Sequence, residues 1–207
     1  MRLLAEGLSA RRGEDLIFND ISFALAAGEA LIVTGPNGSG KSTLLRVLAG
    51  LLQAESGRLR LEGGPSEFEH PYELSHYLGH RNAMKRELTV EENLSFWQRF
   101  MGDSPGGSGV DVAAAAAAVG LSDIAHLPFG YLSAGQQRRM AMAKLLVAYR
   151  PIWLLDEPTA ALDAGADRLF SGLVITHLHR GGIVVAATHQ PLRLERTQAL
   201  QMKGFAH

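Results

Sequence analysis

The stretch 35–43 constrains this chain more than any other part of it. It fills every fixed position of the phosphate-loop pattern, which is Gly, four residues, Gly, Lys and then Ser or Thr. Its residues are Gly35, Pro36, Asn37, Gly38, Ser39, Gly40, Lys41, Ser42 and Thr43. An apolar run at 30–33 precedes the loop, and an apolar-periodic segment at 43–49 follows it. The sequence therefore predicts a buried strand, a tight loop and a helix in direct succession.

Such a loop is suited to the phosphates of a nucleoside triphosphate. Its glycines let the backbone curl so that N–H groups face anionic oxygens, and the next helix presents the positive end of its dipole. Lys41 adds positive charge at the β- and γ-phosphates, and Ser42 offers a hydroxyl to Mg²⁺. We therefore predict that residues 35–43 bind nucleotide and that Ser42 is a ligand of the metal.

The composition excludes several other classes of protein. A length of 207 residues suits one domain with room for a subdomain, and the net charge of -1 gives no overall basic field to attract nucleic acid. The chain has no cysteine, which excludes disulfides, thiol catalysis and cysteine–metal sites. No apolar run approaches the roughly 20 residues that cross a bilayer. We expect a soluble protein, without nucleic acid, whose membrane role would depend on a partner.

Strands alternate with helices along most of the chain, which predicts an α/β protein with a mainly parallel sheet covered on both faces. The predicted strands are 3–5, 21–25, 30–33, 57–61, 151–155 and 182–187. A helix is expected at 163–180, and the tail from Pro191 is expected to form a short helix and an edge strand. The segment 66–80 gives no clear prediction.

Residues 89–149 are predicted to contain helices and no strands, with a flexible break at 102–109. Thr89 and Glu92 have the order of a capping box, which opens a helix that ends near Met101. The alanine-rich segment 112–119 favours a second helix because alanine is the best helix former, with a low-complexity linker as the alternative. A long third helix is expected from Ser133 to about Tyr149.

Two acids and a histidine follow predicted buried strands. Asp156 and Glu157 end the strand 151–155, at the edge where open α/β sheets bind ligands. We predict that Asp156 holds Mg²⁺, directly or through water, and that Glu157 orients or deprotonates the attacking water. A positioned base of this kind contributes roughly 10²–10⁴-fold to the rate. His189 follows the strand 182–187 and is predicted to contact the γ-phosphate, so the predicted catalytic residues are Glu157 and His189.

A second anion site is predicted where the helix near Ser133 begins. Ser133 is a good N-cap, and the turn around it consists of small residues. The stretch comprises Leu132, Ser133, Ala134, Gly135 and Gln136. One phosphate loop already surrounds most of its nucleotide, so we interpret this turn as the cap of a nucleotide held by another chain. An ordinary capped helix is the alternative.

These motifs, in this order and spacing, resemble ABC-type ATPase domains over nearly the whole chain. The resemblance implies a RecA-like P-loop NTPase core of the α/β class, with an antiparallel β part and an inserted helical subdomain. It implies one domain over residues 1–207, with a catalytic core at about 1–79 and 150–207 and a helical subdomain at about 80–149. It also implies a head-to-tail dimer that holds two ATP molecules with Mg²⁺, each between one loop and the other chain's signature turn. The residues Ala161, Leu162 and Asp163 match the loop that couples the two sites.

Two positions depart from the family pattern. Family members carry an aromatic residue about two dozen positions before the loop, where this chain has Arg11 or Arg12. A guanidinium can stack on a base through a cation–π contact. The family also has a glutamine that contacts the metal, where this chain has His80 or Arg81. The sequence does not distinguish between the members of either pair.

Within the superfamily, three stretches are similar to the CcmA family, the ATP-binding subunits of the bacterial haem exporter of cytochrome c maturation. They are residues 77–80, 85–94 and 181–192. This resemblance implies integral membrane partners, CcmB with CcmC and CcmD, and a peripheral location on the cytoplasmic face of the inner membrane. It ties the work of the chain to haem export and to the release of haem from a periplasmic chaperone. The chain has no haem-ligation motif, so we expect its partners to handle the haem.

Two other functions compete with the transporter interpretation. A soluble ABC ATPase that acts in cytosolic cofactor assembly would use the same catalytic residues. A translation- or DNA-associated ABC protein is disfavoured, because such relatives usually carry two ATPase halves or long coiled-coil insertions. The side chains of Phe96, Trp97 and Phe100 could line a groove for a membrane protein's helix, and packing inside the helical subdomain is their other use.

Overall fold

The computed structural model describes residues 1–65, 68–159, 162–189 and 194–203. The chain divides into two compact units. The first comprises residues 1–79, 151–158 and 174–207, and the second comprises residues 80–150 and 159–173.

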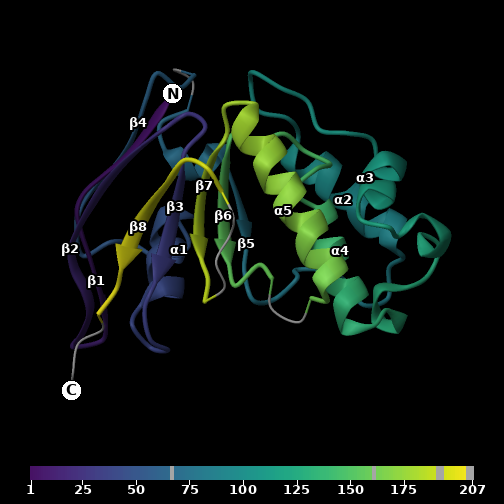
Figure 1. The fold of residues 1–207 in the computed structure, drawn as a ribbon, viewed down its shortest axis with the longest axis horizontal. Coiled ribbons are helices and arrows are strands. Elements are labelled where there is room, and N and C mark those ends of the chain that lie inside the picture. The colour runs from purple at the N-terminus through teal and green to yellow at the C-terminus, as the bar shows by residue number, and fades with distance from the viewer. Residues whose placement is uncertain (66–67, 160–161, 190–193, 204–207) are drawn as a thin grey trace. The chain divides into compact units, whose positions relative to one another are not determined.

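A five-stranded parallel sheet forms the centre of the first unit (Figure 1). Its order is β5-β6-β7-β3-β8. The strands are β3 (Ala30–Thr34), β5 (Ser75–Leu78), β6 (Ile152–Asp156), β7 (Ile183–Ala187) and β8 (Thr197–Gln201). Every residue of β6 and β7 is buried, as expected for strands covered on both faces. The predicted parallel sheet is confirmed.

A three-stranded antiparallel sheet completes the strands of this unit. Its order is β2-β1-β4, with β1 at Arg2–Arg12, β2 at Asp15–Ala26 and β4 at Ser56–Glu62. Helix α1 (Lys41–Leu48) contributes Leu44, Leu45 and Leu48 to a core shared with side chains of both sheets. One hydrophobic core therefore fixes the helix that follows the phosphate loop.

The second unit is helical. It contains α2 (Val90–Met101), α3 (Val112–Ala118) and α4 (Ala134–Ala143), with short 3₁₀ turns at Ser122–Ile124 and Phe129–Tyr131. A further 3₁₀ turn, Pro71–Leu74, belongs to the first unit, and α5 (Ala164–His179) is shared between the two units. Asp111 caps α3, and the predicted capping box of α2 is present, since Thr89 accepts from the Glu92 N–H and Glu92 accepts from the Thr89 N–H.

The long helix predicted from Ser133 to about Tyr149 is wrong beyond Ala143. The backbone N–H groups of Leu145 and Leu146 bond three residues back, which tightens the chain into turns. The connection before α3 is hydrogen-bonded to the segment that follows these turns. Val110 donates its N–H to the Leu146 carbonyl, and Ser104 donates to the Tyr149 carbonyl. Contacts with a segment distant in sequence therefore hold the chain beyond Ala143.

The structure adds detail in the segment 66–80 and in the tail. Strand β5 lies in the segment that gave no clear prediction. The edge strand of the tail is confirmed as β8. Residues 194–196 are not helical, and residues 190–193, where the short tail helix was expected to begin, lie outside the described residues.

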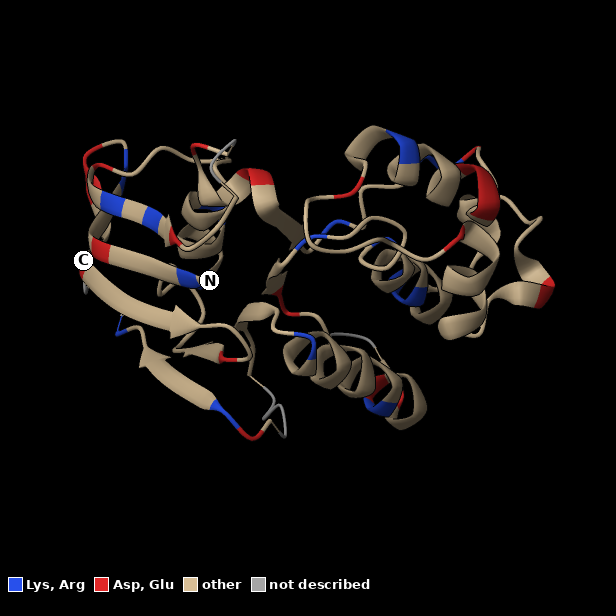
Figure 2. Ribbon diagram, turned by 90° about the horizontal axis from the view of Figure 1, so that it is seen from above, with Lys and Arg blue, Asp and Glu red and all other residues tan. Residues whose placement is uncertain are grey.

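Acidic and basic residues are interspersed along the ribbon of each unit (Figure 2). None of the helices in the described part of the chain is long and apolar enough to cross a bilayer.

Candidate functional site

The phosphate-loop residues lie between the end of β3 and the first turn of α1. Gly40, at the N-cap, has a left-handed backbone with φ of 94°, and the side chain of Ile17 occupies the space that a Cβ there would need. The Lys41 ammonium donates to the carbonyl oxygens of Gly35 at 2.8 Å and of Pro36 at 3.0 Å. The loop is therefore curled around its own lysine.

A groove of about 270 Å³ opens along this loop. Its lining comprises Arg12, Ile17, Asn37, Gly38, Gly40, Lys41, Ser42, Thr43 and Glu157. Six residues of the loop thus line the same groove as Glu157, which directly follows β6. This arrangement fits a polyphosphate, because a lysine and the first residues of helix α1 line one groove.

Ser42 and Asp156 form a pair of oxygen donors. The Ser42 hydroxyl donates to Asp156 Oδ1 at 3.0 Å, and Asp156 is buried at the carboxyl end of β6. Hydroxyl and carboxylate oxygens are the ligands that Mg²⁺ prefers, and such sites take their remaining ligands from water and substrate phosphates. No cluster of three or more His, Asp or Glu side chains suited to a metal occurs among the described residues. The donors present therefore fit a cation bound together with a nucleotide.

Glu157 and His189 lie close together at the ends of neighbouring strands. His189 Nε2 is 3.4 Å from Glu157 Oε1 and 3.1 Å from Asn37 Oδ1. The backbone of Glu157 is left-handed, with φ of 45°, and its N–H donates to the Ala187 carbonyl of β7. The structure thus brings together the two predicted catalytic residues and the loop.

The structure distinguishes Arg11 from Arg12, the two candidates for the position of the family's aromatic residue. Arg12 lines the groove, whereas Arg11 donates to the Glu14 carbonyl at 2.9 Å and lies 3.9 Å from Glu55. Sequence reasoning missed Ile17, which lines the groove, and Tyr77, whose hydroxyl lies 3.4 Å from Asp156 Oδ2. The short apolar run before Gly79 was the only sequence signal for the strand that carries Tyr77.

The predicted signature residues belong to the second unit. Leu132 is buried, Ser133 and Ala134 are exposed, and Gly135 is partly exposed at the start of α4. The Ser133 side chain accepts from the Gln136 N–H at 3.3 Å, and Gln136 Oε1 accepts from the Ser133 N–H at 2.8 Å. The predicted N-cap is confirmed, and it forms a reciprocal capping box.

Most of the remaining predicted positions also lie in the second unit. His80 and Arg81 begin it, and the choice between them stays open. Ala161 lies outside the described residues, together with 190–192 of the resemblance to CcmA. Asp163 caps α5. Its carboxylate accepts hydrogen bonds from the N–H groups of Ala166 and Gly165, and these bonds lower its pKa.

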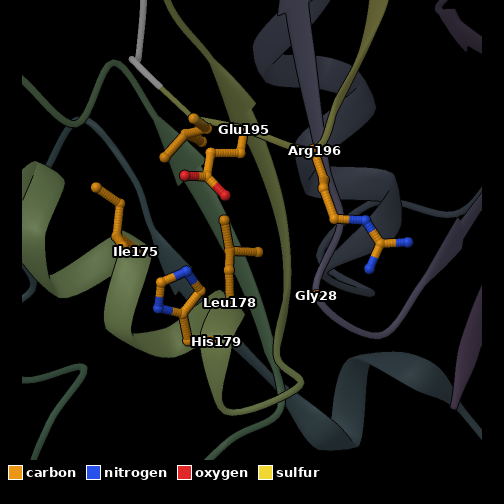
Figure 3. Close-up of a pocket in the computed structure, with 7 residues that line it drawn as sticks. Gly28, Ile175, Leu178, His179, Glu195 and Arg196 are labelled. Carbon is orange, nitrogen blue, oxygen red and sulfur yellow. The ribbon is translucent and has the colours of Figure 1, made fainter.

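A second cavity of the first unit lies at the amino end of β3, away from the phosphate loop. It has a volume of about 120 Å³ and is mostly apolar (Figure 3). Its lining comprises Gly28, Ile175, Leu178, His179, Leu194, Glu195 and Arg196. No phosphate-loop residue lines it, so it is separate from the groove.

Known proteins match most or all of this chain. A family model described as an ABC transporter matches residues 18–160. The cytochrome c biogenesis ATP-binding export protein CcmA of Rhizobium meliloti (strain 1021) is 82% identical over all 207 residues and over its full length. The protein of the same name from Agrobacterium fabrum is 66% identical, with 100% of this chain and 97% of the relative covered.

Solved structures share the fold at low sequence identity. A putative ABC transporter ATP-binding protein from Pyrococcus furiosus superposes with a TM-score of 0.78 at 21% identity, covering 97% of this chain and 98% of the other. An ATP-binding subunit of an ABC transporter gives a TM-score of 0.76 at 20% identity, covering 91% and 80%. The predicted fold class, a RecA-like α/β core with an antiparallel part and a helical insert, is thereby confirmed.

Proposed function

Because this chain belongs to the ABC transporter family, and within it to the cytochrome c biogenesis ATP-binding export proteins named CcmA, we propose that its hydrolysis of ATP drives haem export and haem release from a periplasmic chaperone. ATP binding and hydrolysis follow from the family. The proposal adds Mg²⁺ as cofactor, haem as cargo and a catalytic core at about 1–79 and 150–207.

The observation that carries the proposal is the groove that Lys41, Ser42 and Glu157 share. Lys41 is held by two loop carbonyls, so its charge is already fixed where the β- and γ-phosphates bind. Ser42 and Asp156 would hold Mg²⁺, which would supply positive charge to the phosphates. The charge and oxygen donors of one groove thus match a magnesium triphosphate.

Glu157 and His189 have separate roles in the proposed reaction. Glu157 lines the groove, where its carboxylate orients the attacking water and accepts its proton. His189 Nε2 lies within reach of Glu157 and of Asn37 in the loop, so the imidazole donates to the γ-phosphate from a position next to the base. In this division the carboxylate accepts the proton and the imidazole orients the γ-phosphate.

The signature residues act in the partner of a head-to-tail dimer. Ser133 and Ala134 are exposed, and the N-terminal end of α4 carries the positive end of a ten-residue helix dipole. A surface that favours anions and is open to solvent suits a nucleotide held by the other chain. We propose that the residues 132–136 of each chain complete the site of its partner.

The helical subdomain, about 80–149, carries a surface suited to a membrane partner. Phe96 is 42% exposed and Phe100 is 68% exposed, and the two rings stack with centroids 5.6 Å apart. Together with Glu92 and Arg99 they line a hollow of about 390 Å³. We propose that a helix of an integral subunit similar to CcmB, acting with CcmC and CcmD, binds here and holds the chain at the cytoplasmic face of the inner membrane.

Co-purification from native membranes tests the proposal. Glu157→Gln removes the base but leaves the phosphate contacts, so with ATP and Mg²⁺ this variant should accumulate in the ATP-bound dimer. We expect it to capture integral subunits similar to CcmB with CcmC and CcmD, identified by mass spectrometry, together with haem detected by absorbance.

Three comparisons sharpen this experiment. Lys41→Ala should capture less, because it binds ATP weakly. Phe100→Asp should lose the integral subunits while it retains ATP affinity, whereas Val110→Asp, at another exposed apolar residue of the same unit, should retain both. Capture of soluble assembly proteins alone would contradict haem export and favour cytosolic cofactor assembly.

A further inference from the structure

The carboxylate of Asp156 is held through both of its oxygens. Oδ1 accepts from Ser42 at 3.0 Å, and Oδ2 faces the Tyr77 hydroxyl at 3.4 Å. Tyr77 lies on β5, where its backbone pairs with Leu154 of β6, two residues before Asp156. The two strands that carry these side chains are therefore hydrogen-bonded to each other in a fixed register.

A second group acts on the same hydroxyl. Arg46 of α1 is hydrogen-bonded to the phenol, so the phenol lies between a guanidinium and a carboxylate. A donor that itself accepts a charged hydrogen bond is polarised and donates more strongly.

The ring of Tyr77 is also confined. A Cβ at Gly79 would lie 2.8 Å from Tyr77 Cε1 and 3.1 Å from its hydroxyl oxygen. Gly79 has no such atom, and the ring occupies that space. The ring of Tyr77 therefore packs directly against Gly79.

From these contacts we propose that Tyr77 is a positioning residue for the divalent cation. Its hydroxyl fixes the rotation of the Asp156 carboxylate, so that Oδ1 stays turned towards Ser42. Groups that orient a metal-binding carboxylate typically change metal affinity 10- to 100-fold when removed. This inference rests on the proposed function, in which Ser42 and Asp156 hold Mg²⁺, and it adds a residue that the phosphate-loop and acid motifs do not contain.

Binding of a fluorescent ATP analogue, measured with Mg²⁺ or with EDTA, tests the proposal without turnover. In Tyr77→Phe we expect the Mg²⁺ concentration for half-maximal enhancement of binding to rise about tenfold. Affinity in EDTA should be unchanged, because the loop and Lys41 are intact. Tyr149→Phe, a phenol of the second unit, is the matched control and should behave as the wild type.

A second variant guards against a purely structural effect. Gly79→Ala keeps the Tyr77 hydroxyl but pushes on its ring, so the Mg²⁺ requirement should rise in this variant too. Thermal unfolding of each variant identifies any loss of folding.

The outcomes separate the two proposals. An unchanged Mg²⁺ requirement in Tyr77→Phe, or an equal loss of affinity with Mg²⁺ and with EDTA, would overturn the role of Tyr77 alone. A wild-type protein that gains no ATP affinity from Mg²⁺ would overturn the proposed metal site itself, and the role of Tyr77 with it.

Discussion

At the scale of single residues, two adjacent arginines have different surroundings. Arg12 lines the groove beside Ile17, while Arg11 is held by the Glu14 carbonyl and lies near Glu55. A guanidinium over the face of a base contributes about 0.5–2 kcal/mol. The geometry therefore favours Arg12 as the residue that stacks on adenine.

Substitution of each arginine checks this assignment. Arg12→Ala should weaken ATP binding by roughly 2- to 30-fold, the equivalent of a lost cation–π contact. Arg11→Ala should leave ATP affinity unchanged, since its guanidinium is engaged on the strand. Isothermal titration with ATP measures both, and equal effects of the two variants would contradict the assignment.

The sequence could not choose between these arginines for a physical reason. Successive residues of a strand point to opposite faces, so one of the two must face the groove. The pairing of β1 with β2 shifts register between Ala10 and Arg11, and such a shift reverses the faces. The spacing from the phosphate loop does not reveal that irregularity. The loop itself could be predicted, because its pattern is local.

At the scale of elements, α5 packs on the parallel sheet through a buried histidine. The ring of His177 stacks on Trp153 of β6 with centroids 4.0 Å apart, and a Cβ at Gly182 would collide with it. Burial lowers the pKa of His177 from 6.5 to about 4. The imidazole is therefore neutral in the folded protein at pH 5, where it is protonated in the unfolded chain.

This packing predicts a loss of stability in mild acid. The unfolded chain binds a proton at His177 below pH 6.5, and the folded protein binds it only below about pH 4, so stability falls as the pH decreases through this window. Between pH 7.5 and pH 5 the contribution of His177 should fall by about 2 kcal/mol. Urea unfolding at the two pH values measures it. His177→Phe keeps a flat ring, so between the two pH values its free energy of unfolding should fall by about 2 kcal/mol less than that of the wild type. Equal losses in the two proteins would contradict the prediction.

Whether an element could be predicted from the sequence depends on whether its stabilising contacts are local. The start of α2 was predictable, because its capping box is confined to residues 89–92. The end of α4 was not, because the segment that follows it is held by hydrogen bonds from Val110 and Ser104, more than thirty residues earlier. Strand β5 has four residues, which is too short for alternation to identify, and it depends on pairing with β6.

At the scale of the whole molecule, the catalytic residues of one chain do not complete the proposed site. The order of the motifs along the chain predicted the family, since each motif has a fixed place in the fold. The position of one chain's signature residues against another chain's nucleotide depends on an interface between two copies, and that interface has no local pattern.

Ser133→Arg tests the two-chain site. A large cation at this exposed N-cap should block the approach of the partner's phosphates, so ATP affinity of the monomer stays within about twofold and ATP hydrolysis falls more than tenfold. Ser122→Arg, at an exposed serine elsewhere in the same unit, should keep normal hydrolysis. Steady-state phosphate release measures the hydrolysis, and nucleotide titration measures the ATP affinity. Normal hydrolysis in Ser133→Arg would exclude the head-to-tail model.

The backbone of Glu157 has a consequence for attempts to engineer this protein. Its φ of 45° lies in a region that costs a residue with a side chain about 1–2 kcal/mol and that glycine adopts freely. Glycine at this position would relieve that strain and abolish the proposed base. Directed evolution for heat resistance alone would therefore select against the proposed base, and a thermostabilising library should hold position 157 constant.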